Sequence, residues 1–443
     1  MAAADRITKF VKDLKAKGIR YVRFEVPDTH GVSRLKVIPI DAVEGYARSG
    51  LNMYGGVFAL DTASSVVPGT GLHEEVAYSD KRLIPDLDSV QIVPWLPHTA
   101  KVICDCQWAP GEPIKSAPRY VLRKLLDEAA DMGFDVMMGH EFEFYLLDPG
   151  TKQPLFGGLH IFNSIRNQYV PFLDEVLDQL QAIGIDVITH NCEYSPAQFE
   201  TNFGPAVGLA AADKAFTFKN AMKELAHRAG YLATFMSKPA NDMSGCGCHV
   251  HMSLINRKGK KNAFADAKAH DGMPDLMRAF TQGLLDHAPA MAPLIGPTPN
   301  CYRRLKPHTF APSNISWGKE DRSALVRMKH LGESASHIEM RAASAMSNPY
   351  LSAAAVLAAG LIGIKKKRKL QAAVKGPSED NPDLPKLPQT LEQALDGLAA
   401  DKDMCKLLGE DFVHVFTTVK RFELARFHDA VTEWERNEYL EIH

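Results

Sequence analysis

Three short segments carry polar side chains two residues apart, the spacing that puts both on one face of a β-strand. The pairs are Glu141 and Glu143 in GHEFEFYLL, His249 and His251 in GCGCHVHMSL, and Glu339 and Arg341 in SHIEMRAA. The residue inside each pair is apolar, so each strand can bury one face and present the polar pair on the other. Carboxylates that converge in a core repel one another unless cations neutralise them, so the pattern predicts a metal site.

Two further carboxylates, Glu193 and Glu200, flank the segment CEYSPAQFE. Oxygen ligands together with one imidazole favour Mg²⁺ or Mn²⁺ over zinc. Each pair alone also has an ordinary interpretation, because Glu-x-Glu is usually a solvated strand face and Glu-x-Arg can pair with itself. The C-x-C pairs, at 104–106 and 246–248, favour buried thiols over a zinc site.

Arginines form a second group, in the segment NCYRRLKPHTFAPSNISWGKEDRSALVRM and just after it. They are Arg303, Arg304, Arg322, Arg327 and Arg341. Guanidinium groups bind carboxylate and phosphate oxygens through paired hydrogen bonds. An acidic cage beside arginines suits metal-assisted phosphoryl transfer to a carboxylate. The phosphate-binding loop GxxxxGK[ST] is absent, so an ATP site would be of another type.

The composition excludes several classes of function. Lys and Arg total 51 against 53 Asp and Glu in 443 residues, so the net charge of -2 gives no general attraction to nucleic acid or to a membrane surface. The basic run at 365–369 follows an apolar segment of about 14 residues, too short to span a bilayer, and predicts the solvated end of a core helix. Seven cysteines and a charged N-terminus predict reduced thiols and a cytoplasmic protein.

The hydrophobic periodicity indicates elements that can position these groups. We expect helices at 4–17, 118–133, 171–183, 212–228, 274–288 and 348–364, a hairpin at 21–40, short strands to about 106, strands at 134–147 and 185–194, a surface loop at 374–389 and a helical tail. The helix-Gly-strand units that end in acidic residues predict a sheet backed by helices, with the site on the opposite face.

The order of the motifs resembles the glutamine synthetase superfamily over essentially the whole chain. The five motifs are GHEFEF, EYSPAQFE, KPANDMSGCGCHVHMSL, NCYRRLKP with DRSALVR, and IEMR with NPY. The resemblance implies an α+β fold, with an N-terminal β-grasp-like domain over 1–107 and a catalytic domain with a curved antiparallel sheet over 108–443. It also implies a homo-oligomer, usually a dodecamer, whose active sites lie between subunits.

By motif position, the resemblance implies two or more Mg²⁺ or Mn²⁺ ions per site, with ATP as co-substrate. The ligands of the first metal would be Glu143, Glu193 and Glu200, and those of the second Glu141, His249 and Glu339. The second metal would hold the ATP phosphates, and His251 would contact them.

The resemblance also implies the groups that bind glutamate and stabilise the transferred phosphoryl group. Gly245 would lie in the glutamate-binding loop, and Arg304 would bind the substrate carboxylate. Arg322 and Arg341 would stabilise the phosphoryl group, Arg341 would also adjoin the glutamate, and Arg322 and Arg327 would lie at the nucleotide. The implied chemistry passes through γ-glutamyl phosphate, from which a nitrogen nucleophile displaces phosphate.

Two departures from the glutamine synthetase pattern concern the ammonium site. Where bacterial glutamine synthetases carry a flap glutamate, PHTFAP places Phe310, and the N-terminal D-G-S-S loop is replaced by VFALDTASS, in which Asp61 is the nearest acid. An aromatic ring cannot accept a proton but can pack an alkyl or aryl group. The tyrosine that is adenylylated in many glutamine synthetases has no counterpart in SEDNPDLPKLP.

These departures favour the amine-ligating branch, which includes γ-glutamylmethylamide, γ-glutamylpolyamine and glutamylanilide synthetases. We therefore expect a glutamate–amine ligase with an amine pocket at Phe310 and Asp61, and methylamine as the first candidate. The alternatives are a glutamine synthetase that uses ammonium, a polyamine or anilide synthetase, and a non-catalytic structural relative resembling the lens protein of this superfamily.

Overall fold

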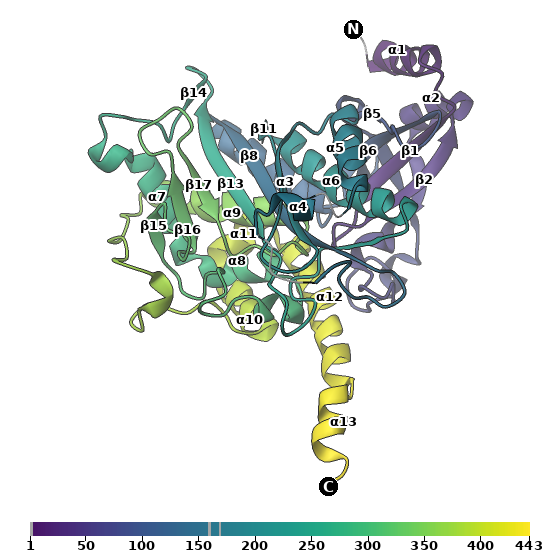
Figure 1. The fold of residues 1–443 in the computed structure, drawn as a ribbon. Helices are drawn as coiled ribbons and strands as arrows, with labels where there is room; N and C mark the ends of the chain where they lie inside the picture. Colours follow the sequence, from purple (N-terminus) through teal and green to yellow (C-terminus); the bar gives the residue numbers. More distant parts are fainter. Residues whose placement is uncertain (1–2, 158–160, 168–169) are drawn as a thin grey trace.

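The computed structural model describes residues 3–157, 161–167 and 170–443, and its strands form two sheets (Figure 1). The first sheet has the order β2-β1-β6-β4-β3, with β5 and β7 also paired to β6. Its strands are β1 (Tyr21–Pro27), β2 (Ser33–Pro39), β3 (Leu51–Tyr54), β4 (Asp80–Pro85), β5 (Gln91–Ile92), β6 (Thr99–Ala109) and β7 (Glu112–Pro113). β1 and β2 form the expected antiparallel hairpin, whereas β1 and β6 run parallel. Helices α1 (Ala3–Ala16) and α2 (Ile40–Ser49) accompany this sheet.

The second sheet carries every strand with a predicted metal ligand. Its order is β15-β16-β17-β13-β8-β10-β9, and short strands β11, β12 and β14 pair with β8 or β13. The bounds are β8 (Phe134–Leu147), β9 (Val187–Cys192), β10 (Gln198–Phe203), β11 (Ala206–Val207), β12 (Leu232–Thr234), β13 (Cys248–Asn256), β14 (Lys261–Asn262), β15 (Trp317–Lys319), β16 (Val326–Lys329) and β17 (His337–Met340). The pairs along this path are antiparallel apart from β15 with β16. The expected α+β class with a curved antiparallel sheet is confirmed.

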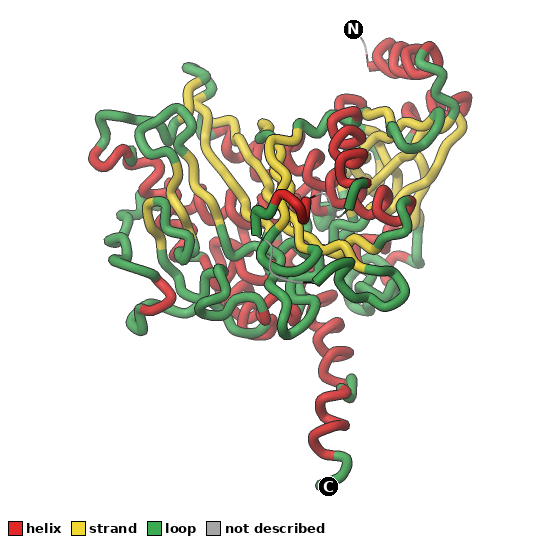
Figure 2. The backbone as a smooth tube through the Cα atoms, viewed as in Figure 1, coloured by secondary structure: helices red, strands yellow, loops and turns green. Residues whose placement is uncertain are grey.

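Helices lie behind the second sheet and form the main core with it (Figure 2). They are α3 (Pro118–Asp131), α6 (Leu209–Arg228), α7 (Asp275–Asp286), α8 (Ala288–Ile295) and α9 (Pro349–Lys365). α5 (Phe172–Ala182) packs in a second core cluster with β8 and β10, and the short helix α4 (Ser164–Asn167) lies next to β9. α9 is the expected core helix, since its residues from Pro349 to Gly363 are all buried, and Asn348 caps its first turn through its side-chain oxygen. Among the described residues, no helix is both long and apolar enough to cross a membrane.

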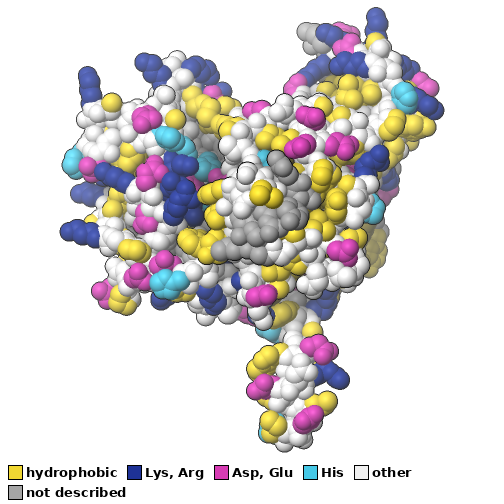
Figure 3. Space-filling view, in the orientation of Figure 1, with side chains coloured by type: hydrophobic (Ala, Val, Ile, Leu, Met, Phe, Trp, Pro, Cys, Tyr) yellow, Lys and Arg dark blue, Asp and Glu magenta, His cyan; other side chains and the backbone are white. Residues whose placement is uncertain are grey.

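The C-terminal part continues through α10 (Leu391–Ala400), α11 (Lys402–Leu408), α12 (Glu410–Asp429) and α13 (Glu433–Tyr439). α12 packs against the body as far as Leu424, and α13 projects away from it (Figure 1). The projecting segment exposes apolar side chains, including Val431 (74% exposed), Trp434 (63%) and Ile442 (75%). Figure 3 shows hydrophobic side chains on the tail, while positive and negative side chains are interspersed over the face of the body that is drawn.

Three expectations from the sequence need correction. The helix expected at 274–288 is two helices, α7 and α8, because the chain turns at His287 and Pro289 begins the second. The segment 374–389 is not wholly a surface loop: Ser378 and Leu387 are buried, and Ser378 lies in the short 3₁₀ helix η6 (Ser378–Asp380). Arg341 lies just beyond the end of β17 at Met340. The domain boundary at 107 stays a prediction, and β7 beyond it still pairs with β6.

Candidate active site

The strand register of the second sheet aligns the predicted ligands across neighbouring strands. On β8, Glu141 lies opposite His249 of β13 and Glu143 opposite Glu200 of β10. On the next pair, His251 of β13 lies opposite Glu339 of β17. Because residues two apart on a strand share a face, these matches put the acidic and histidine pairs on one side of the sheet. The other face of β8 is apolar there, with Phe142 and Phe144 fully buried.

Glu141, His249 and Glu339 form the tightest cluster of possible metal ligands. One possible ligand atom from each of the three residues lies within 4.8 Å of the other two. Among the residues that the structure describes, these three therefore form a group close enough to hold one metal ion. His249 Nδ1 is 2.8 Å from Glu141 Oε1 and 3.4 Å from Glu339 Oε1. These interactions hold the pKa of Glu141 well below its usual range against the opposing effect of burial. Burial is likewise outweighed at Glu339, where His249 and Arg341 lower the pKa to about 2.

The other three predicted ligands are close enough to affect one another but do not converge on one point as tightly. Glu143 Oε2 accepts the N–H of Gly247 at 2.8 Å, and Glu200 Oε1 accepts from Asn202 Nδ2 at 2.8 Å. Burial, reinforced by Glu141, Glu143 and Glu193, raises the pKa of Glu200 to about 10. Burial and Glu143 raise the pKa of Glu193 to about 7. These three carboxyl groups therefore cannot all be ionised at once without added positive charge.

The donor set fits divalent magnesium or manganese. It consists of carboxylate oxygens and one imidazole, the hard ligands those ions prefer, and it contains no thiolate. Burial and neighbouring carboxylates raise the pKa values of Glu193 and Glu200, because they disfavour the ionised forms. Bound cations would offset this effect. The cysteines do not compete, because each thiol with a shifted pKa has it raised by burial.

Arg304 lies in a slot made by two glycines. A Cβ at Gly245 would meet Arg304 Cγ at 2.5 Å, and one at Gly247 would meet Arg304 Nη2 at 2.4 Å. Its guanidinium is 4% exposed and donates to the carbonyl oxygens of Arg341, Ala342 and Ala343 at 3.2–3.4 Å. The slot thus fixes a buried cation in the cage beside Glu143, whose charge opposes the lowering of the Arg304 pKa by burial.

The remaining arginines are linked through Glu339. Arg341 Nη1 pairs with Glu339 Oε1, and Arg341 Nε donates to the Arg322 carbonyl oxygen at 2.9 Å. Arg327 lies opposite Glu339 on β16 and contacts its Oε2 at 3.1 Å. Arg322 is exposed and lines a cavity of about 470 Å³. The structure therefore brings Arg304, Arg327 and Arg341 directly to the acidic cluster and puts Arg322 at its edge.

His251 faces both the cluster and a neighbouring cleft of about 480 Å³. Its Nε2 is 3.3 Å from Glu141 Oε2, and its Nδ1 is 3.2 Å from His337 Nε2. His337 Nδ1 lies 2.6 Å from the Ala335 carbonyl oxygen, which can only accept, so His337 must donate there and offer a lone pair at Nε2. His251 then donates from Nδ1, which leaves its Nε2 directed at the acidic cluster.

The two residues assigned to the amine pocket lie in different surroundings. The Phe310 ring is 5.7 Å from that of Tyr194, the residue after Glu193. Asp61 is fully buried, accepts the N–H groups of Ala63 and Ser65 and pairs with Arg426 of α12. Within this chain the structure therefore brings Phe310 to the metal-ligand region and does not bring Asp61 there.

Sequence reasoning did not single out Gly247, Tyr194 or His337. Gly247 had a readable signal, as the second glycine directly before the H-x-H strand. Tyr194 and His337 had no signal that sets them apart. Tyr194 follows Glu193 just beyond the end of β9, and His337 is the first residue of β17.

Comparisons with known proteins identify the family. Residues 115–439 match the family model of the glutamine synthetase catalytic domain. The chain is 31% identical to gamma-glutamylanilide synthase of Acinetobacter sp., covering 99% of this chain and 96% of the relative. It is 32% identical to glutamine synthetase of Halobacterium salinarum, covering 99% and 98%. A solved structure of GmaS with ADP superposes with a TM-score of 0.88 at 29% identity, covering 98% of this chain and 99% of that one. The chain belongs to the glutamine synthetase family of carbon–nitrogen ligases.

Proposed function

We propose that this protein joins the γ-carboxylate of L-glutamate to a small primary amine, with methylamine as the first candidate, at the expense of ATP. The observation that carries the proposal is Phe310, an aromatic residue where a glutamine synthetase that uses ammonium would carry an acid. Its ring packs on Tyr194 beside Glu193, so an aromatic wall adjoins the acidic cluster. Such a wall favours a substituted amine over ammonium, because it can pack a methyl group but cannot take a proton.

The residues of the cage have separable roles in this proposal. Glu141, His249 and Glu339 would hold one divalent cation and Glu143, Glu193 and Glu200 another, and bound cations supply charge neutralisation for the ATP phosphates. His251 directs its Nε2 toward the same region from the wall of the 480 Å³ cleft, which we assign to the nucleotide together with Arg327.

Arg304 would bind the glutamate carboxylate, because it is a buried cation fixed between Gly245 and Gly247. Arg341 and Arg322 would stabilise the γ-phosphoryl group as it passes to the glutamate side chain and ADP leaves. The amine nitrogen then forms a bond to the carbonyl carbon of the γ-carboxyl group, the bond from that carbon to the phosphate oxygen breaks, and the nitrogen loses a proton. Because Glu339 receives hydrogen bonds from both Arg341 and Arg327, it holds the two guanidinium groups in place.

The runner-up is a glutamine synthetase with a rebuilt ammonium site. It is supported by a comparable identity to glutamine synthetase of Halobacterium salinarum and to gamma-glutamylanilide synthase. An anilide synthetase is compatible with the aromatic wall. A polyamine synthetase would need carboxylates for the distal ammonium group, and the lining of the 470 Å³ cavity mixes Asp321 and Glu379 with Lys319 and Arg322.

We also propose a cytoplasmic homo-oligomer of the dodecamer type. The exposed apolar side chains of the projecting C-terminal segment support an oligomer, since Val431, Trp434 and Ile442 would gain burial against another subunit. Mostly buried thiols support a reducing compartment.

The test is phosphate release from ATP with Mg²⁺ and glutamate, with one nitrogen donor at a time. The donors are ammonium, methylamine, longer alkylamines, putrescine and aniline, and mass spectrometry identifies the amide. We expect the highest kcat/KM with methylamine. Dominant turnover with ammonium would contradict the amine proposal, and no turnover with any donor would favour a non-catalytic relative.

A further inference from the structure

Phe310 is the last residue of the segment 306–310, here called the flap, and little of its side chain is buried. The ring is 70% exposed, so its own packing contributes little to holding it. His308 has φ of 59° and Phe310 φ of 57°, which is the left-handed region that residues with a side chain rarely adopt. A flap with this backbone needs contacts from outside to stay in one conformation.

Glu379 supplies such a contact from a distant part of the chain. Its Oε2 accepts the backbone N–H of His308 at 2.6 Å, and its Oε1 is 3.7 Å from His308 Nδ1. The bond is made to a charged acceptor at the centre of the flap, which makes it stronger than one between neutral groups. On the other side, Thr309 Oγ1 donates to the Arg304 carbonyl oxygen at 3.0 Å. The flap is thus tied to Arg304 at one point and to Glu379 at another.

Glu379 is itself fixed to the turn that carries Arg322. The preceding residue, Ser378, is fully buried; its N–H donates to Ser323 Oγ at 2.8 Å and its hydroxyl donates to the Ser323 carbonyl oxygen at 2.7 Å. Asn314 Nδ2 donates to the Ser378 carbonyl oxygen at 2.6 Å. Glu379 therefore extends from a rigid base, and movement of its carboxylate relative to Arg322 is restricted.

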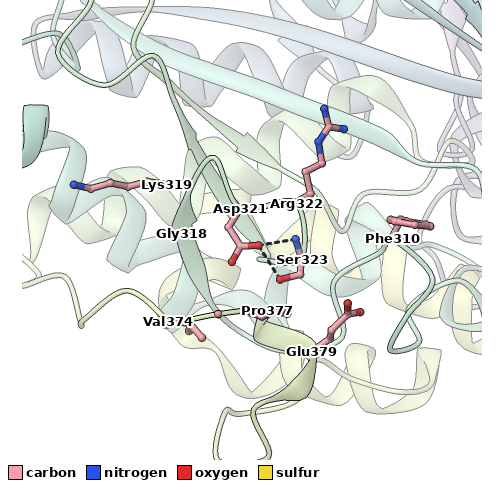
Figure 4. A pocket seen from close by; sticks show the side chains of 10 residues that line it. Phe310, Gly318, Lys319, Asp321, Arg322, Ser323, Val374, Pro377 and Glu379 are labelled. Carbon is pink, nitrogen blue, oxygen red and sulfur yellow. Dashed lines mark hydrogen bonds between the residues drawn. The ribbon is translucent and has the colours of Figure 1, made fainter. Parts of the chain in front are cut away.

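Phe310, Arg322 and Glu379 line the same cavity of about 470 Å³. Figure 4 shows Glu379 directed toward the flap that bears Phe310, while Asp321 is engaged by Ser323 in the turn beside it. Phe310 thus stands between this cavity and Tyr194. If the flap moved, the aromatic wall next to Glu193 would open. The Arg304 guanidinium would keep its place between Gly245 and Gly247, because the flap is bonded to the main chain of Arg304 and not to its side chain.

We propose that Glu379 is a positioning residue that holds the flap, and thereby Phe310, in the conformation that sets affinity for the amine. This inference rests on the proposed function, because it takes Phe310 as part of the amine pocket. Glu379 acts through the flap backbone rather than on the substrate.

The experiment compares the full-length protein with Glu379→Ala, Glu379→Gln and Asp380→Asn. The Gln variant loses the charge but keeps an oxygen that can accept the His308 N–H. Asp380→Asn is the matched control: it removes the same charge one residue away, its side chain is 58% exposed, and it contacts the His308 ring at 3.5 Å rather than the backbone. Hydrogen exchange of the peptide that contains His308 and KM for amine, glutamate and ATP are measured for each protein.

We expect exchange at His308 to accelerate about tenfold or more in Glu379→Ala, and the KM for amine to rise about tenfold, the effect of losing one hydrogen bond to a charged acceptor. KM for glutamate and ATP should change less than about twofold. Glu379→Gln should lie between Glu379→Ala and wild type, because it keeps an acceptor oxygen without the charge. Asp380→Asn should behave as wild type. If Gln is as impaired as Ala, the charge rather than the hydrogen bond matters and the positioning role is wrong.

The two readouts separate the inference from the proposed function. Unchanged exchange at His308 in Glu379→Ala would overturn the positioning role whatever the enzyme's substrate. Accelerated exchange with an unchanged KM for amine would overturn the link between the flap and amine affinity, and with it the assignment of Phe310. Accelerated exchange in a protein with no ligase activity would refute the proposed function alone.

Discussion

The acidic cage predicts that one active-site carboxylate destabilises the metal-free protein. Burial and three neighbouring carboxylates raise the pKa of Glu200 to about 10, against an ordinary value of 4.5. A carboxyl group whose pKa is raised on folding leaves stability intact below 4.5 and reduces it as the pH rises toward 10. Glu200→Gln removes that titration while keeping nearly the same shape, so we expect the variant to be more stable than wild type without metal.

The size of the effect follows from the interval between 4.5 and the working pH. Each pH unit costs about 1.4 kcal/mol, which sets an upper limit of about 5 kcal/mol at pH 8. Partial exposure lets the carboxylate turn toward solvent, so we expect about 2 kcal/mol. For a chain of this length, that corresponds to a rise of about 2 °C in Tm. At pH 5 the difference should nearly vanish.

The assay is thermal unfolding in EDTA at pH 5 and pH 8, at matched protein concentration, and again with Mg²⁺. Mg²⁺ should reverse the order, because it stabilises wild type by binding the folded state and the variant lacks one ligand charge. Glu339→Gln is the contrasting control. His249 and Arg341 outweigh burial and lower the pKa of Glu339 to about 2, so the ionised form of Glu339 stabilises the fold above pH 4.5. Removing that charge should therefore lower Tm at pH 8. A Glu200→Gln variant that is no more stable than wild type at pH 8 in EDTA would refute the reasoning.

Three further outcomes follow from the geometry. Phe310→Glu should raise the ratio of kcat/KM for ammonium to kcat/KM for methylamine about tenfold. The ratio is measured by phosphate release, with Phe310→Leu as control. An unchanged ratio would show that Phe310 does not set specificity. Gly247→Ala should raise KM for glutamate about tenfold or more, because its Cβ would lie 2.4 Å from Arg304 Nη2. Stabilisation by ADP and Mg²⁺ in thermal unfolding should persist. Normal glutamate affinity would contradict the role of the Arg304 slot in binding glutamate. Deleting residues 431–443 should lower the mass of the oligomer in light scattering, since it removes the exposed Trp434 and Ile442, and an unchanged mass would exclude a role in assembly.

The sequence predicts those parts of the site that depend on strand periodicity. Glu141 and Glu143 had to share a face once 134–147 was a strand, and the antiparallel register then sets His249 and Glu200 beside them. The family resemblance supplied what periodicity cannot, namely which residues bind metal and which bind glutamate. Gly247 was readable from its place before the H-x-H strand.

The parts that escaped prediction depend on contacts between loops. The interval 374–389 reads as a polar, proline-rich surface loop, yet it holds Ser378 in the core and directs Glu379 at the flap. Asp61 stays a prediction for the amine pocket, because it is the nearest acid in VFALDTASS. Its pairing with Arg426, 365 residues away in the sequence, is a tertiary contact that no local pattern indicates.

Glu339 connects the two electrostatic halves of the site. Without arginines, a buried carboxylate beside Glu141 would be expected to bind a proton, as Glu200 does. His249 and Arg341 instead keep Glu339 ionised, and in return Glu339 fixes the Arg341 and Arg327 guanidinium groups where a phosphoryl group would carry negative charge. A phosphoryl group competing for those guanidinium groups would weaken their hold on Glu339 and leave that carboxylate more available to a cation. Binding of nucleotide phosphate and of the cation at this ligand set should therefore favour each other, because both draw on the same carboxylate–arginine contacts.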